Sequence, residues 1–207
     1  MKSQSPRGAI RASLPPVEAK KNQPVCHLAT DFCAASLTRL ELAVMRIQEA
    51  YSNWVTELHK YAGGPPLSFQ DVALLHCVRL RGGTPSLGEM LIFQHRHDLS
   101  SLQYGFKKLE SVGCLRRVRG PNRRETCYAM TEFGVKITDR YAELRSRMLV
   151  QLCADVVGLD DAMGQAAEVL ERIIGKYDQA TQSVFNDHIL GRENPYSHAP
   201  TRGTSKP

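Results

Sequence analysis

A long stripe of apolar side chains near the start of the chain is the sequence feature that most constrains the fold. Nine residues follow one another at alternating steps of four and three: Cys33, Leu37, Leu40, Val44, Ile47, Tyr51, Trp54, Leu58 and Tyr61. This spacing places them on one face of a helix about eight turns long. The run Gly63-Gly64-Pro65-Pro66 then ends the helix, because proline cannot donate the hydrogen bond needed to continue it. Such a stripe must be covered by another element.

A second stripe with the same spacing lies near the other end of the chain. It follows Asp160 and Asp161, which suit the positive end of a helix dipole. Its members are Met163, Ala166, Leu170, Ile173, Tyr177, Ala180 and Val184. Two such stripes are typical of coiled-coil association, so we expect both helices to form the interface of a homodimer. Packing of the two helices on each other within one chain is the alternative.

The middle of the chain predicts short helices and one hairpin. Ser68 to Asp71 and Ser86 to Glu89 have the spacing of capping boxes, which predicts helices to about Leu80 and Gln94. A third helix, capped by Asp98 or Ser100, runs to about Val112, and the last two helices form a helix-turn-helix. Strands are expected at 114–119 and 125–130 around the turn Gly120-Pro121-Asn122-Arg123, with another helix from about Thr131. We expect the inner face of that helix to carry Val135, Tyr141, Leu144, Met148 and Leu152.

These patterns predict a mainly α fold with a small β-hairpin wing, in which a winged helix-turn-helix is flanked by long dimerisation helices. We expect a disordered arm over 1–27 and a disordered tail over 191–207, where prolines and polar residues dominate. The remaining domain, 28–190, divides into a dimerisation helix (28–62), a DNA-binding lobe (66–132) and C-terminal dimerisation helices (133–190). The sequence has no apolar run long enough for a membrane span and no secretory signal, so the cytoplasm is the expected compartment.

Positive charge is concentrated in the third helix and the hairpin. Between Arg96 and Arg124 there are eight basic and two acidic residues, so this segment carries a net charge of +6, equal to that of the whole chain. The basic residues are Arg96, Lys107, Lys108, Arg116, Arg117, Arg119, Arg123 and Arg124. A local excess of this kind favours contact with phosphates, whereas an ordinary solvated surface usually mixes the two signs.

The same segment resembles the winged-helix pattern of the MarR family, from about Ser68 to Tyr141. The resemblance is carried by a capped helix, a recognition helix that ends in Lys-Leu-Glu before a glycine, an arginine in the wing and a Thr-x-x-Gly after it. The matching residues are Ser86-Leu87-Gly88-Glu89-Met90, the run from Asp98 to Leu115, Asn122-Arg123-Arg124 and Met130-Thr131-Glu132-Phe133-Gly134. Gly105, in the middle of this recognition helix, indicates either a close backbone approach or simple tolerance.

The resemblance implies a homodimer that binds double-stranded DNA and regulates transcription, which we expect to act as a repressor. It implies that the recognition helix enters the major groove and that Arg124 of the wing reaches a minor groove. The residues expected to face DNA are Ser100, Ser101, Gln103, Tyr104 and Lys107, to which the charge cluster adds Lys108, Arg117, Arg119 and Arg123. The family often binds small aromatic effectors, for which Tyr51, Trp54, His76 and Arg79 are candidate pocket residues; ordinary core packing is the favoured alternative for these four.

Other function classes are less well supported by the sequence. The seven histidines are dispersed, and His95 and His97 would point to different faces of a helix, so we expect neither an enzyme, a cofactor nor a metal site. The six cysteines contain no Cys-x-x-Cys pair, although a redox-sensing thiol stays open. A winged-helix adaptor for protein partners is the other alternative, and salt-dependent DNA binding would distinguish it.

Overall fold

The computed structural model describes residues 27–120 and 126–190. The described residues fall into two units, with the boundary between residues 152 and 153. The elements of the first of these are α1 (Phe32–Tyr61), α2 (Phe69–Arg81), α3 (Leu87–Phe93), α4 (Leu99–Ser111), β1 (Leu115–Arg119), β2 (Thr126–Met130), α5 (Glu132–Arg145) and the π-helical turn η1 (Ser146–Val150). Helix α6 (Gln151–Ala154) spans the boundary, and α7 (Leu159–Ile189) belongs to the other unit. Apart from His27 and Gly120, the expected arm, tail and hairpin turn lie outside the described residues.

Helix α1 confirms the first long helix. It begins where the Asp31 carboxylate accepts a hydrogen bond from the Ala34 N–H at 2.8 Å, and it ends before Gly63, whose φ of +85° favours glycine. Only its last two turns are buried, through Val55, Leu58 and His59. The earlier part of the apolar stripe stays exposed, with Ile47 62% exposed. Among the described residues, cover is therefore confined to one end of this stripe.

Helices α2, α3 and α4 begin at the predicted caps. Ser68 and Asp71 form the capping box of α2, and Ser86 and Glu89 form that of α3. Asp98, rather than Ser100, caps α4. These capping side chains accept hydrogen bonds from backbone N–H groups that the first turn of a helix leaves without partners. The helix-turn-helix is thus fixed by local hydrogen bonds as well as by packing.

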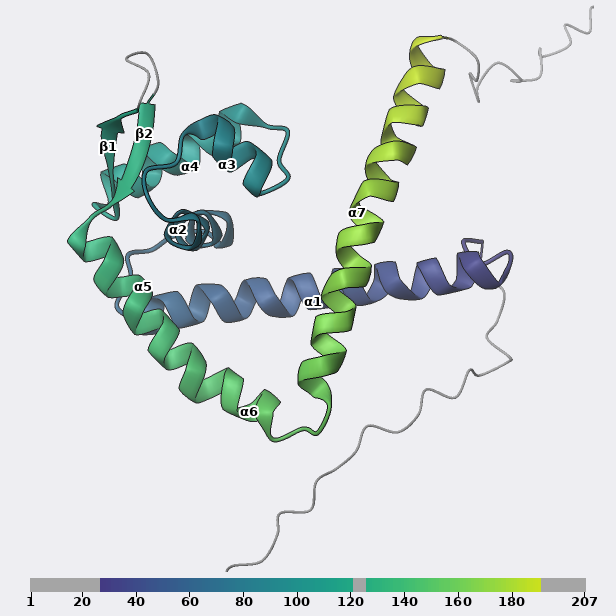
Figure 1. Cartoon of the computed structure of the whole chain (residues 1–207), viewed down its shortest axis with the longest axis horizontal. Helices are drawn as coiled ribbons and strands as arrows, with labels where there is room; N and C mark the ends of the chain where they lie inside the picture. The colour runs from purple at the N-terminus through teal and green to yellow at the C-terminus, as the bar shows by residue number, and fades with distance from the viewer. Residues whose placement is uncertain (1–26, 121–125, 191–207) are drawn as a thin grey trace, which may run out of the picture. The chain divides into compact units, whose positions relative to one another are not determined.

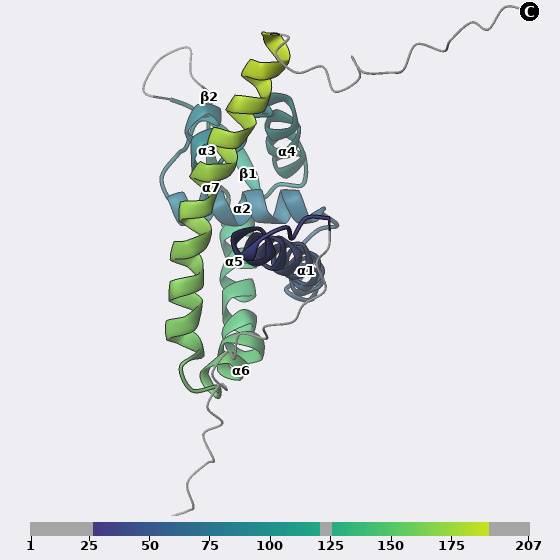
Figure 2. The ribbon, with the colours of Figure 1, turned by 90° about the vertical axis from the view of Figure 1, so that its right-hand side faces the viewer.

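The hairpin follows α4 directly. Strands β1 and β2 are antiparallel, with Leu115 opposite Met130 and Arg119 opposite Thr126, so each strand differs from its predicted bounds by one residue. The segment before α3 extends this small sheet, because the Pro85 carbonyl accepts a hydrogen bond from the Tyr128 N–H at 3.1 Å. In Figures 1 and 2 the hairpin lies beside α2, α3 and α4, at one end of α1.

One apolar core joins these elements. Leu74, Leu75, Met90 and Phe106 are among its largest fully buried side chains. Helix α2 lies at the centre of this arrangement because it packs against α1, α3, α4, α5 and β2. The position of α4 relative to α1 is therefore set mainly through α2.

The helix after the hairpin differs from the expectation of a single inner face running to Leu152. Tyr141 and Leu144 are buried, but Met148 is 44% and Leu152 66% exposed. The π-helical turn at Ser146–Val150 explains this, because its wider turn shifts the side chains that follow onto a different face. The periodicity of the sequence continues through this point, but the buried face does not.

Helix α7 confirms the second long helix, and it follows Gly158, whose φ is +75°. None of its residues is buried, and Met163, Tyr177 and Val184 of the predicted stripe are all exposed. Within the described residues, we find no helix with both the length and the apolar character needed to cross a membrane.

Candidate nucleic-acid interface

Helix α4 presents most of the side chains predicted to face DNA. Its inner face buries Leu102, Phe106 and Leu109 in the core. The predicted residues at positions 100, 103, 104 and 107 are exposed and recur at steps of three and four, so they share the opposite face. The described structure thus brings a hydroxyl, an amide, a phenol ring and an ammonium group together on one outward helical face. These are groups that can contact base edges and phosphates.

The first turn of α4 is held by its cap and by a side chain from the preceding turn. One carboxylate oxygen of Asp98 accepts hydrogen bonds from the Ser100 N–H at 2.9 Å and the Ser101 N–H at 3.1 Å. The Arg96 guanidinium donates to the Ser101 hydroxyl at 2.9 Å. Arg96 was counted in the basic cluster but not among the DNA-facing residues, and its contact with a predicted one could be found only in three dimensions.

Gly105 allows α2 to approach α4 closely. A Cβ atom at this position would lie 2.9 Å from a methyl group of Leu74 and 3.6 Å from the Asp71 carboxylate. The close approach, one of the two explanations considered for this glycine, therefore accounts for it. On the next residue, the Phe106 ring stacks on Tyr128 of β2 with ring centres 4.1 Å apart. These two contacts fix the orientation of the outward face of α4 relative to α2 and the hairpin.

The hairpin adds exposed arginines beside α4. Arg116, Arg117 and Arg119 are all exposed on β1. The Arg117 guanidinium lies 3.3 Å from the Glu110 carboxylate of α4, so part of its charge is already balanced. Lys108 is half-buried, whereas Arg119 projects from the last position of the strand. Of the predicted wing residues, Arg123 and Arg124 lie outside the described residues.

His95 and His97 lie in the turn between α3 and α4. They are not on a helix, so helical geometry does not place them on different faces. His95 has a φ of +51°, and this left-handed conformation brings the two imidazole rings to a centre-to-centre distance of 5.6 Å. The expectation that they point apart was therefore wrong. Both rings are exposed next to the first turn of α4.

Three of the four candidate pocket residues gather where α1, α2 and α5 meet. The His76 ring of α2 lies against Tyr141 of α5, with ring centres 4.2 Å apart. Trp54 of α1 packs on the apolar cluster that contains Tyr141. Tyr51 of α1 contributes to the raised pKa of Tyr141 and also meets the edge of Phe69 at 5.5 Å between ring centres. The contacts described for these side chains are those of a packed junction.

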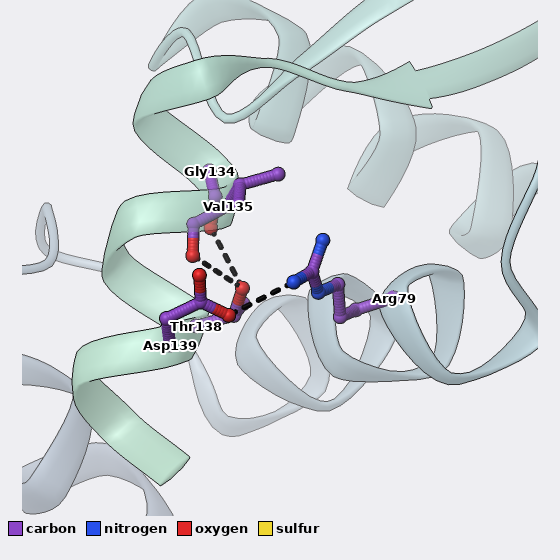
Figure 3. Close-up of polar contacts among 5 residues, drawn as sticks. All are labelled: Arg79, Gly134, Val135, Thr138 and Asp139. Carbon is purple, nitrogen blue, oxygen red and sulfur yellow. Dashed lines mark hydrogen bonds and ion pairs between the residues drawn. The ribbon is translucent and has the colours of Figure 1, made fainter. Parts of the chain in front are cut away.

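Arg79, the fourth candidate, forms an ion pair. Its guanidinium lies 2.8 Å from the Asp139 carboxylate of α5, next to Thr138, whose hydroxyl donates to the carbonyls of Gly134 and Val135 (Figure 3). Both charged side chains are substantially exposed, at 42% and 61%, so the pair contributes only about 0–1 kcal/mol. It links α2 to α5 beside the packed junction.

Burial controls the protonation of the junction. Burial, together with charge repulsion from His59 and Arg145, lowers the pKa of His76 from 6.5 to about 4. Burial also lowers the pKa of His59, although the nearby Pro65 carbonyl partly offsets this effect. The pKa of Tyr141 is raised to about 12 by burial and by Tyr51, with Arg145 acting in the opposite direction. Near neutral pH all three rings are therefore uncharged.

The cysteines differ in exposure. Cys33 is exposed, Cys77 and Cys153 are half-buried, and Cys114 and Cys127 are buried. Burial raises the pKa of the Cys114 thiol, which disfavours the reactive thiolate at this position. Cys26 lies outside the described residues.

Comparison with known proteins identifies the fold. No family model and no curated protein sequence matches the chain. Among solved structures, it is similar to a MarR-family transcription regulator, with a TM-score of 0.58, 13% identity, and coverage of 70% of this chain and 94% of that one. It is also similar to a mutant MarR from E. coli in complex with operator DNA, with a TM-score of 0.54, 15% identity, and coverage of 67% and 95%.

A third similar structure is wild-type MarR from E. coli without ligand, with a TM-score of 0.50, 17% identity, and coverage of 65% of this chain and 96% of that one. At these identities the likeness establishes the fold. The chain has the winged-helix fold of MarR-family transcription regulators, with the predicted mainly α architecture and a two-stranded hairpin. The fold expected from the sequence resemblance is thereby confirmed.

Proposed function

We propose that this chain is a MarR-family transcription regulator that binds a specific double-stranded DNA sequence as a homodimer. The observation that carries the proposal is the outward face of α4, which combines base-contacting and cationic side chains beside a hairpin with three exposed arginines. The similarity of the fold to MarR bound to operator DNA supports it.

In the proposed complex, α4 enters the major groove. Gln103 is suited to bidentate pairing with adenine and Lys107 to contact with the acceptors of guanine. Tyr104 is 69% exposed, so its ring is available to contact a thymine methyl group or a backbone sugar. The inner residues of the helix pack on the core, which would hold these groups in a fixed orientation during docking.

Other residues of the interface are proposed to contact phosphates. Ser100 and Ser101 lie at the start of α4, where the positive end of the helix dipole attracts phosphate oxygens. Lys108, Arg117, Arg119 and Arg123 would supply charge without sequence preference, and Arg124 would lie in the minor groove, which is narrow and negative. Arg96 joins this set through its hydrogen bond to Ser101.

The homodimer is proposed from the exposed stripes on α1 and α7. On α1, Ile47 is 62% and Tyr51 52% exposed, and on α7 none of the 31 residues is buried. A long helix whose apolar stripe faces water gains little stability from its own hydrogen bonds, so both helices need a covering partner. A second copy of the chain provides matching stripes of the same length and spacing.

Within this function we propose repression as the mode of action, since an operator-bound dimer can block a promoter without further contacts. A small aromatic effector would have to enter between Tyr51, Trp54 and His76 and displace their present packing on Tyr141. Asp139 would compete with it for Arg79.

The test of DNA binding is the affinity of the purified protein for random-sequence duplex over a range of salt concentrations. Several phosphate contacts predict a steep loss of affinity with salt, with a slope of about −0.9 for each contact. If DNA binding does not depend on salt, or if the protein does not bind DNA even at low salt, the result would favour an adaptor for protein partners instead. Sedimentation at micromolar concentration tests the dimer separately, and a monomer there would contradict it.

A further inference from the structure

Two imidazoles, one buried and one half-buried, lie at the junction of α1, α2 and α5. His59 of α1 is 1% exposed, and its ring occupies the space beside Gly64 that a Cβ atom would need. His76 of α2 is half-buried against Tyr141 of α5. Among the described residues, neither ring nitrogen of His59 makes a regular hydrogen bond, although the nearby Pro65 carbonyl favours its protonated form, and the Nε2 atom of His76 has no hydrogen-bond partner. Buried polar atoms without partners are rare in proteins and cost stability.

The groups around the two rings make protonation more costly still. From α1, His76 faces His59; from α5, it faces the cationic Arg145 and the uncharged phenol of Tyr141. Tyr51 of α1 acts on Tyr141 in turn. The carboxylate of Asp139, which precedes Tyr141 in α5, is already paired with Arg79. A proton on either imidazole would therefore meet a buried environment in which the neighbouring charges are repulsive.

The junction also connects the two parts of the proposed regulator. Helix α1 carries the exposed stripe of the proposed dimer interface, and α2 packs against both α1 and α4. Leu74 of α2 packs so closely over Gly105 of α4 that no space remains for a Cβ atom there, so the two helices are tightly packed and a change in the position of α2 is expected to affect α4.

We propose that His59 and His76 form an acid-sensitive switch, which loosens the packing of α1 and α5 on α2 when the rings take up protons. The charged imidazoles leave the apolar junction for water, and α2 is released from the orientation in which it holds α4. The opening itself does not depend on DNA binding, but its effect on operator affinity rests on the proposed function.

The direction and size of the effect follow from proton linkage. A histidine whose pKa is lower in the packed state stabilises that state fully above its ordinary pKa of 6.5, and this advantage is lost as the pH falls below 6.5 towards 4. For His76 alone, lowering the pH from 7.5 to 5.5 shifts the balance between packed and open forms about tenfold towards the open form. Protonation of His59 acts in the same direction.

Trp54 gives a direct readout of this opening. It is the only tryptophan of the chain, and it packs on the apolar cluster of Leu58, Tyr141 and Leu144. We expect its fluorescence emission to change between pH 7.5 and pH 5 while far-UV circular dichroism keeps its helical signal. The change should be reduced in His76→Gln and retained in the control His95→Gln, which alters an exposed ring in the turn before α4.

Three results would overturn the switch: an emission that is constant over this pH range, a change that is unaltered in His76→Gln, or a parallel loss of helical signal. If His76→Gln does not fold, NMR titration of His76 in the unaltered protein decides, because a midpoint at or above 6.5 contradicts the proposal. Operator affinity should fall on acidification, and an affinity that stays constant or rises would contradict the transfer of the opening to α4. Absence of DNA binding at every pH would refute the proposed function and leave the Trp54 result intact.

Discussion

Gly134, the glycine of the Thr-x-x-Gly motif, is predicted to be one of the least replaceable residues of the winged helix. A Cβ atom there would lie 2.2 Å from the backbone carbonyl oxygen of Cys114. That carbonyl also accepts hydrogen bonds from the Thr131 N–H and the Thr131 hydroxyl, both at 3.1 Å. The Thr131 hydroxyl in turn accepts from the Gly134 N–H at 3.0 Å. One contact thus joins the start of α5 to the segment between α4 and β1.

Gly134→Ala should therefore destabilise the protein by about 2–3 kcal/mol. Overpacking of a well-packed site costs about 1–3 kcal/mol, and the high end applies because the obstructing atom is backbone and cannot rotate away. Alanine is a better helix former than glycine by up to about 1 kcal/mol, which offsets part of this cost. Urea unfolding at a fixed protein concentration measures the difference.

Two further glycines provide matched controls. At Gly105 the obstructing atom is the end of the Leu74 side chain at 2.9 Å, so Gly105→Ala should cost less than Gly134→Ala. At Gly164 of α7 no side chain of the described residues lies within 4 Å of the added Cβ position, so Gly164→Ala should leave stability unchanged or raise it by up to about 1 kcal/mol. The reasoning fails if the alanine variant at Gly134 is as stable as the original protein, or if the order of the three variants is reversed.

The remaining predictions concern DNA binding and assembly. Alanine at Gln103 or Lys107 should cost about 1–3 kcal/mol on the preferred duplex and little on random duplex, and an equal loss on both would mean that these residues touch only phosphate. Arg124→Ala should weaken binding to every duplex and reduce the magnitude of the salt slope by about one unit; an unchanged slope rules out a phosphate contact. Replacing Val44 and Ile47 together with aspartate should yield monomer or unfolded chain by sedimentation, and a stable dimer would exclude this stripe from the interface.

Features governed by local chemistry were predicted well from the sequence. The two capping boxes and the two long helices depend on residues within a few positions of one another, so spacing alone is informative. The outward face of α4 also follows from spacing, once the helix is known. The dimer interface and the DNA contacts stay predictions, because one described chain does not test them.

Features that depend on distant residues or unusual backbone geometry could not be found in this way. The π-helical turn at Ser146–Val150 interrupts the buried face of α5 although the sequence pattern continues. The left-handed conformation of His95 brings two rings together that regular helix geometry would separate. The sequence analysis does not single out His59 or Asp139, because His59 acts on His76 of α2 and Asp139 pairs with Arg79 of α2, and both interactions join different helices.

The preferred DNA sequence tests the central claim most directly. Repeated selection of bound duplexes from a random pool, followed by sequencing, reports both specificity and symmetry in one measurement. A homodimer with one recognition helix in each of two successive major grooves predicts an enriched inverted repeat, with half-site centres about 10 base pairs apart. A pool with no enriched sequence, or a single site without two-fold symmetry, would contradict a dimeric, sequence-specific regulator.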